Sequence, residues 1–227
     1  AEEGIYAADT SSDASISVVS SAQEGIVVWN LEYQQRLFKW HHEGDEDSVN
    51  TIANIHIAAD NSYVVTSDRE AFALWNLDSG EPEGFWRIDE STIRDVAVSN
   101  QGRGILVGRG NGKVMFFEPQ TGRRIEFLGH QEKINSVDIS PNGYYALTGG
   151  NDYVAFLWDT RSGQVIHRFT HTSRVTKVAL DDQGRYGFTA DSQRGAKVWD
   201  LQTGREVSQL SFLQRQKIFS SAQGKCG

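Results

Sequence analysis

The chain has little cysteine, little proline and no long apolar run. It contains one cysteine, Cys226, and three prolines in 227 residues. A single cysteine excludes an internal disulfide and a zinc site made of several cysteines. A membrane-spanning helix needs roughly 18 or more consecutive apolar residues, and no stretch approaches that length. We therefore expect no transmembrane segment within this chain.

Positive charge is also scarce. Lysine and arginine together number 22 against 30 aspartates and glutamates, which gives a net charge of −8. Nucleic-acid binding needs clustered cations that neutralise phosphates, whereas the basic residues here are dispersed. The composition therefore argues against a nucleic-acid partner. Aromatic residues make up 11% and glycines number 22, which is typical of β-strands joined by tight turns.

An aromatic residue followed by a polar residue recurs every 41 to 46 residues. The five pairs are Trp29-Asn30, Trp75-Asn76, Phe117-Glu118, Trp158-Asp159 and Trp199-Asp200. Each of the last four pairs leads into a turn sequence with a glycine, such as DTRSGQ, and short stretches of alternating apolar and polar residues follow. The pattern predicts repeated units of four short strands and no helix. The units cover about residues 5–40, 48–88, 92–128, 133–169 and 174–210.

One unit resembles a known repeat over its whole length. The stretch GHQEKINSVDISPNGYYALTGGNDYVAFLWD at 129–159 is similar to a WD40 repeat, with Gly129-His130 at its start and Trp158-Asp159 at its end. The unit that ends at Trp199-Asp200 is the next best match. The resemblance implies an all-β fold, a single WD40-type β-propeller domain over 1–227, in which four-stranded blades pack around a channel.

The number of units differs from the family pattern. WD40 propellers usually have seven blades, whereas five units are recognisable here. Residues 217–222 (KIFSSA) resemble the first strand of a sixth unit, and 223–227 do not continue the pattern. We therefore expect a fragment of a seven-bladed ring.

The repeats are degenerate and look bacterial, and the chain begins at Ala1 rather than at methionine. These features leave the compartment open between the cytoplasm and the periplasm or a lipid anchor, and slightly favour the bacterial cell envelope.

Four polar or aromatic residues of the best-matched unit invite a functional interpretation. The resemblance implies a hydrogen-bonded structural tetrad of His130, Thr148, Asp152 and Trp158. The alternative is acid–base catalysis with Thr148 as nucleophile, which requires access to substrate. Thr148 lies in a predicted inner strand, so that access is poor. We expect the tetrad to stabilise the blade by satisfying buried polar groups.

The next unit repeats part of this set. His171, Thr189 and Trp199 occupy the corresponding positions, with Gln193 in place of the acid and Asp191 two residues earlier. Catalytic sets are not usually repeated unit by unit, so the repetition favours a structural role. The third unit departs further, since Asp89 and Phe117 replace the histidine and the tryptophan.

Two groups of charged residues are candidate partner-binding sites. The first is the acidic insertion after His41, which aligns with the tetrad histidine; its carboxylates are Glu43, Asp45, Glu46 and Asp47. Their spacing does not fit a calcium loop, so we expect a solvated acidic loop and no metal. The second group stands at the start of equivalent inner strands, near one end of the channel: Arg94, Lys133 and Arg174. These cations could receive an acidic partner segment, or could be ordinary surface charge balanced by Glu90, Asp95 and Glu132.

The sequence predicts a non-enzymatic protein–protein interaction scaffold that uses the loops and channel mouth of the propeller. It predicts no cofactor, and other proteins as partners of a monomer or of a larger assembly. One alternative is a cell-envelope assembly factor of the same architecture. Another is a propeller enzyme such as a quinoprotein-like dehydrogenase, whose repeats carry similar glycine turns. In those repeats the signature tryptophan follows the turn, whereas Trp158 and Trp199 precede it.

Overall fold

A computed structural model describes residues 4–42, 52–193 and 195–210. In this part of the chain, twenty β-strands form five antiparallel four-stranded sheets, joined by turns and one short 3₁₀ segment, Asn100–Gly102. The all-β prediction is confirmed.

Each sheet is formed by four consecutive strands, and we number the sheets as blades 1 to 5. Blade 1 consists of β1 (Ile5–Thr10), β2 (Ile16–Ser21), β3 (Gly25–Asn30) and β4 (Gln35–Trp40). Blade 2 consists of β5 (Asn54–Ile57), β6 (Tyr63–Ser67), β7 (Ala71–Asn76) and β8 (Pro82–Arg87). Blade 3 consists of β9 (Ile93–Val98), β10 (Ile105–Arg109), β11 (Val114–Phe117) and β12 (Arg124–Phe127). Blade 4 consists of β13 (Ile134–Ile139), β14 (Tyr145–Gly150), β15 (Val154–Asp159) and β16 (Gln164–Thr170). Blade 5 consists of β17 (Val175–Leu180), β18 (Tyr186–Asp191), β19 (Ala196–Asp200) and β20 (Arg205–Leu210).

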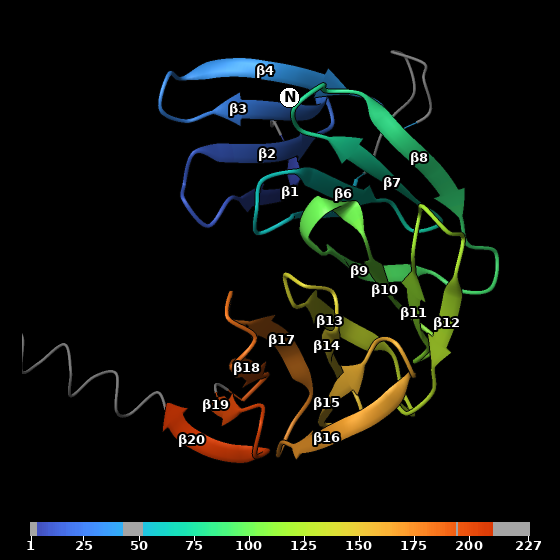
Figure 1. Ribbon diagram of the computed structural model, residues 1–227, viewed down its shortest axis with the longest axis vertical. Coiled ribbons are helices and arrows are strands. Elements are labelled where there is room, and N and C mark those ends of the chain that lie inside the picture. The colour runs from blue at the N-terminus through green and yellow to red at the C-terminus, as the bar shows by residue number, and fades with distance from the viewer. Residues whose placement is uncertain (1–3, 43–51, 194, 211–227) are drawn as a thin grey trace, which may run out of the picture.

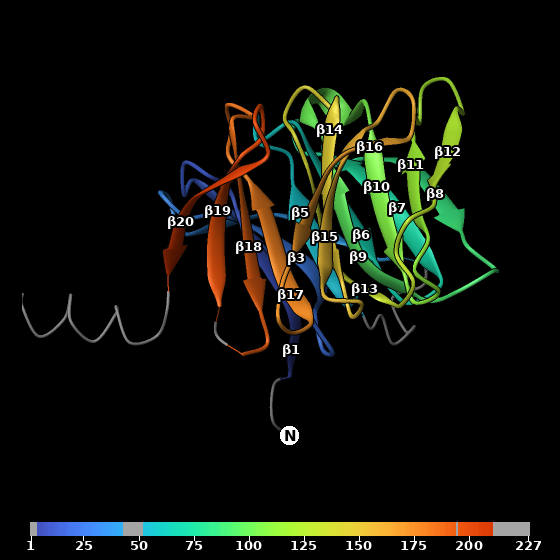
Figure 2. The ribbon, with the colours of Figure 1, turned by 90° about the horizontal axis from the view of Figure 1, so that it is seen from below.

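The blades follow one another along an arc, with blades 1 and 5 at its two ends (Figure 1). The strands lie roughly along one common axis, so the connections between them gather at two opposite faces (Figure 2). Because neighbouring strands are antiparallel, one face carries the turns within the first and second hairpins of each blade, such as 141–144 and 160–163. We call it the turn face. The other, the linker face, carries the connections between hairpins and between blades, such as 151–153 and 129–133.

The core lies between the blades. In the contact of blades 3 and 4, Phe127 stacks on Trp158 at 5.2 Å between ring centroids, and both are almost fully buried. Gly108 lets the next blade approach closely, since a Cβ there would meet the Ile134 side chain at 2.6 Å. Gly149 does the same one blade later, where a Cβ would meet Val175 at 2.4 Å.

The first strands of neighbouring blades are also joined by side chains. Each of blades 1 to 4 offers a polar acceptor to a backbone N–H of the next: Asp9 to Ile57 (2.8 Å), His56 to Val98 (3.1 Å), Asp95 to Val137 (2.8 Å) and Asp138 to Leu180 (2.7 Å). These bonds satisfy polar groups that line the centre of the arc and fix the spacing of the inner strands.

Candidate functional site

The four predicted tetrad residues of blade 4 form one hydrogen-bonded chain. Trp158 on β15 donates its indole Nε1–H to Thr148 Oγ1 on β14 at 2.9 Å. His130 Nε2 lies 2.8 Å from the same hydroxyl, and its Nδ1 lies 2.9 Å from Asp152 Oδ2. A carboxylate only accepts hydrogen bonds, so Nδ1 carries the hydrogen and Nε2 accepts the threonine proton. Every polar side-chain group of the chain from Trp158 to Asp152 is thereby paired.

Asp152 ends this chain in the connection between β14 and β15. Burial alone would raise the pKa of its carboxyl, but hydrogen bonds from His130 and from the Gln131 N–H outweigh burial and hold the pKa below its usual value of 3.8. Asp152 is therefore ionised at neutral pH and ties the linker before β13 to the connection after β14.

The same geometry limits what the tetrad can do chemically. Thr148 is fully buried and its hydroxyl is engaged on both sides, by the Trp158 N–H and by His130 Nε2. A nucleophile must be free to meet a substrate. The hydroxyl has no such access, so this arrangement is suited to joining strands rather than to acyl transfer.

Blade 5 carries a second set with the same connectivity. Trp199 Nε1–H donates to Thr189 Oγ1 at 2.8 Å, and His171 Nε2 lies 2.7 Å from that hydroxyl. His171 Nδ1 contacts Asp191 Oδ2 at 3.2 Å. Asp191 thus supplies the acid, while Gln193, which the sequence alignment put in the acid's place, donates its backbone N–H to Asp191.

Blade 2 contains a third set, which the sequence alignment missed. His42, and not His41, places Nε2 3.2 Å from Thr66 Oγ1, and Trp75 donates to the same hydroxyl at 2.8 Å. Asp68 lies 3.6 Å from His42 Nδ1. The structure therefore corrects the assignment of His41 to the tetrad position. Thr66 and Trp75 stand at the threonine and tryptophan positions of the repeat and could have indicated this set. The longer linker before β5 made it uncertain from sequence which histidine completes the set.

Blade 3 has no such set. Val107 and Phe117 occupy the positions of the threonine and the tryptophan, as the strand registers show. Arg109, two residues after Val107, is fully buried and pairs with Glu126 and with Glu90, the latter at 3.3 Å. Its Nε has no hydrogen-bond partner. No sequence signal singled out Arg109, because an arginine at a strand end resembles a surface residue.

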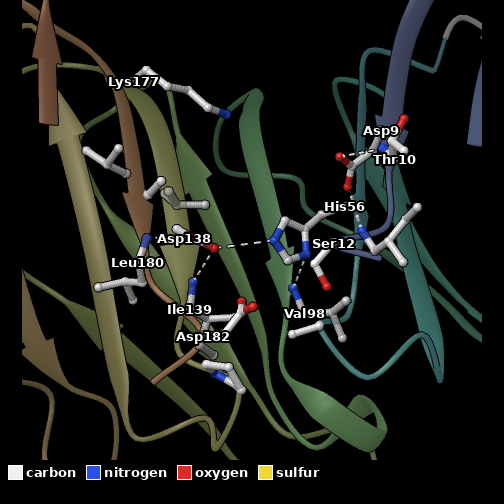
Figure 3. Close-up of a pocket in the computed structure, with 16 residues that line it drawn as sticks. Asp9, Thr10, Ser12, His56, Val98, Asp138, Ile139, Lys177, Leu180 and Asp182 are labelled. Carbon is white, nitrogen blue, oxygen red and sulfur yellow. Dashed lines mark hydrogen bonds and ion pairs between the residues drawn. The ribbon is translucent and has the colours of Figure 1, made fainter. Parts of the chain in front are cut away.

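A cavity of about 240 Å³ lies among the inner strands near the turn face. His56 and Asp138 point toward each other across it, and Lys177 and Asp182 stand at opposite ends (Figure 3). His56 Nε2 lies 3.3 Å from Asp138 Oδ1. Burial by itself lowers the pKa of His56, but the hydrogen bond and charge of Asp138, together with the charges of Asp9 and Asp95, raise that pKa above its usual 6.5.

The predicted cations lie elsewhere. Arg94, Lys133 and Arg174 are exposed at the start of β9, β13 and β17, toward the linker face, and they do not line this cavity. Within the described residues they form no ion pair. Two carboxylates expected to balance them have other partners, since Glu90 contacts Arg109 and Asp95 accepts the Val137 N–H.

Two groups of predicted residues lie outside the described part of the chain. They are the carboxylates Glu43, Asp45, Glu46 and Asp47, and the segment 217–222 with the residues that follow it, including Cys226. In the described residues, no group of three or more histidine, cysteine or acidic side chains is arranged to hold a metal ion. None of the described helices has the length and apolar character required to cross a membrane.

Comparison with known families gives two matches. Residues 122–159 and 163–200 match the family described as WD domain, G-beta repeat. The first match spans β12 of blade 3 and β13 to β15 of blade 4, and the second spans β16 of blade 4 and β17 to β19 of blade 5. No curated protein matches the chain. The two matched segments are WD40 repeats, and the five four-stranded antiparallel sheets are consistent with the blades of a WD40 β-propeller.

Proposed function

We propose that the protein is a non-enzymatic scaffold that binds other proteins through its exposed faces, as is typical of WD40 repeats. The observation that carries this proposal is the threefold occurrence of the buried His–Thr–Trp set in blades 2, 4 and 5. A set that recurs blade by blade with its hydroxyl engaged fits a structural role for His130, Thr148, Asp152 and Trp158, and for His171, Thr189 and Trp199.

The linker face offers a surface for an acidic segment of a partner. Three exposed cations stand where the inner strands of consecutive blades begin: Arg94 is the second residue of β9, and Lys133 and Arg174 directly precede β13 and β17. The inner strands β9, β13 and β17 fix the positions of these three cations. Because the cations form no ion pair with a described residue, they are available to a carboxylate of another protein. Charge complementarity of this kind directs association and makes it sensitive to salt. The acidic residues 43–47 would offer a second contact of opposite charge.

A labelled oligo-glutamate peptide tests the cationic surface by fluorescence anisotropy. We expect binding to weaken about tenfold or more when Arg94, Lys133 and Arg174 are all changed to serine. A matched control changes three exposed cations of the outer strands, Lys39, Arg168 and Arg205, to serine. Equal weakening by both triple variants, or no binding to the unmodified protein, would contradict the proposed surface.

A cell-envelope role would be a narrower form of this proposal, and a quinone-dependent enzyme would be an alternative to it. A cell-envelope assembly factor would share the architecture, and the mass of the protein isolated from its source would show a processed or lipidated N-terminus. A quinone-dependent dehydrogenase would need a bound quinone, which visible absorbance of the purified protein would detect. The described residues give neither role a specific supporting contact.

A further inference from the structure

A second cavity of about 240 Å³ opens on the turn face, between blades 3 and 4. Turns of both blades line it: those after β9 and β11 in blade 3, and those after β13 and β15 in blade 4. Its lining includes Arg103, Gly104, Phe116, Gly143, Tyr144 and Arg161. The cavity is separate from the tetrads, which lie toward the linker face.

This cavity exists where blade 3 lacks a tyrosine. Tyr63, Tyr145 and Tyr186 begin the second strands of blades 2, 4 and 5, and each ring is half-buried. Gly104 takes the equivalent place in blade 3, 41 residues from both Tyr63 and Tyr145. The glycine is not needed for a left-handed backbone, because Gly104 is not among the residues with positive φ.

At the contact of blades 2 and 3, the tyrosine covers a glycine of the following blade. A Cβ at Gly102, in blade 3, would meet the ring of Tyr63 from blade 2 at 3.2 Å. Gly143 is the equivalent residue one blade later, and a Cβ there would find only Ser99 within 4 Å. The space beside Gly143 is therefore free of a ring such as the one that Tyr63 places beside Gly102. Gly184, the equivalent residue of blade 5, also has no atom within 4 Å of such a Cβ although blade 4 carries Tyr145, so the comparison is with the contact of blades 2 and 3.

Phe116 fills only the inner part of the vacated space. A Cβ at Gly104 would meet the Phe116 ring at 2.5 Å, so the two residues are matched to each other. In blades 2 and 4 the smaller Leu74 and Leu157 stand at the position of Phe116, beside the tyrosine. Blade 3 therefore has a glycine and a phenylalanine where blades 2 and 4 have a tyrosine and a leucine, and an opening lies at the surface there.

The rim of the opening carries two arginines, a tyrosine ring and one carboxylate, Glu118, which pairs with Arg123 at 2.9 Å. Arg103 is exposed, and its side chain bonds to the amide oxygen of Gln101 at 2.6 Å but forms no ion pair with any described residue. Arg161 lies over the half-exposed ring of Tyr144 at 4.9 Å and pairs with Asp159 at 2.8 Å. In a chain with a net charge of −8, this rim offers an anion an arginine that no internal acid neutralises.

We propose that this cavity binds a peptide segment that inserts a tyrosine side chain beside Gly104 and places a neighbouring carboxylate against Arg103. The inserted ring takes the place beside Gly143 that the Tyr63 ring takes beside Gly102. Arg103 supplies a charge-assisted hydrogen bond that fixes the peptide's direction. This inference rests on the proposed scaffold function, but it uses the opposite face and a different recognition element.

The test uses the labelled peptide Glu-Asp-Tyr-Asp-Glu in fluorescence anisotropy. The decisive variant is Gly104→Tyr with Phe116→Leu, which copies the tyrosine–leucine pair of blades 2 and 4 and so fills the cavity with a combination that the fold already accepts. We expect this variant to keep its thermal melting temperature and to bind the peptide about tenfold or more weakly. Replacing the peptide's tyrosine by alanine should cause a similar loss.

Charge reversal tests the second contact. Arg103→Glu should weaken binding by about tenfold. Arg185 is the matched control, because it stands at the equivalent place in blade 5, where Tyr186 occupies the space beneath it. Arg185→Glu makes the same change of charge and should leave binding unchanged.

The outcomes separate this inference from the proposed function. Binding of oligo-glutamate without binding of the tyrosine peptide would overturn the cavity proposal and leave the scaffold proposal in place. Unchanged affinity of the filled double variant would also overturn it, as would an equal effect of Arg103→Glu and Arg185→Glu. If neither the oligo-glutamate peptide nor the tyrosine peptide binds, both the cavity proposal and the proposed cationic surface are contradicted.

Discussion

Blades 3 and 4 pack against each other with the same strand order but satisfy their buried groups differently. Blade 4 buries a polar chain from Trp158 through Thr148 and His130 to Asp152. Blade 3 is apolar at the threonine and tryptophan positions and buries Arg109 between two glutamates instead. The shape of a blade therefore depends on filling the same volume and pairing its polar atoms, and several residue sets meet that condition.

The two solutions differ in how completely they are paired. In blade 4 each buried side-chain polar atom of the tetrad has a partner within 3.0 Å. In blade 3 the Nε of Arg109 has none, and the glutamates that pair with it are partly in water. A buried ion pair gives little net stability once desolvation is included. We therefore expect the tetrad to contribute more to stability than the arginine cluster.

The largest effect should come from giving blade 4 the residue of blade 3. Thr148→Val leaves His130 Nε2 and Trp158 Nε1 buried without partners, and each orphaned group costs about 1–3 kcal/mol. We expect the free energy of unfolding to fall by about 2–4 kcal/mol in chemical denaturation. Thr176→Val, at an exposed threonine of blade 5, is the control and should change it by less than about 0.5 kcal/mol. Similar denaturation midpoints for the two variants would refute the structural role of the tetrad.

A smaller effect should appear in the pH dependence of the free energy of unfolding, through His171 of blade 5. Burial lowers the pKa of His171 below 6.5, and Asp191 offsets this only in part. Since the unfolded chain then binds the proton more readily, His171 contributes fully above about pH 6.5, and this contribution is lost as the pH falls below it. We expect the free energy of unfolding of the native protein to decrease on acidification through this range, and His171→Asn to remove that decrease.

His56 acts in the opposite direction, because its pKa is raised in the folded protein and its protonation favours folding. The informative quantity is therefore the difference between native protein and His171→Asn at each pH, in which the contribution of His56 cancels. Parallel stability curves for the two proteins from pH 8 to about pH 5 would show that His171 does not titrate as described.

The repeat made the blades and one tetrad predictable, for physical reasons. Strands alternate between turns at a constant period, so positions in one unit map onto the next. The tetrad of blade 4 was readable because all four residue types stand on the family spacing. The acid is less constrained, since Asp191 and Asp152 reach the histidine Nδ1 from two and four residues beyond the threonine.

Other parts of the site depend on contacts that no local pattern encodes. The linker before β5 is longer than the linkers before the other inner strands, so spacing alone could not distinguish His42 from His41. Arg109 is buried because Glu90 and Glu126 come to it from a linker and from β12, neither adjacent in sequence. The cavity beside Gly104 was readable in principle as a missing tyrosine, but its size depends on how far Phe116 fills the space.

The smallest effect should come from removing the buried cation of blade 3. Arg109→Met keeps most of the side-chain volume, and the side chains of Glu90 and Glu126 are already 61% and 32% exposed, so water can solvate them. We expect the free energy of unfolding to change by less than about 1 kcal/mol, because the lost ion pairs are offset by relief of the desolvated guanidinium. Arg36→Met, in the exposed pair with Glu24, is the control for loss of a surface ion pair. A loss for Arg109→Met as large as that for Thr148→Val would mean that blade 3 depends on its arginine as strongly as blade 4 depends on its threonine.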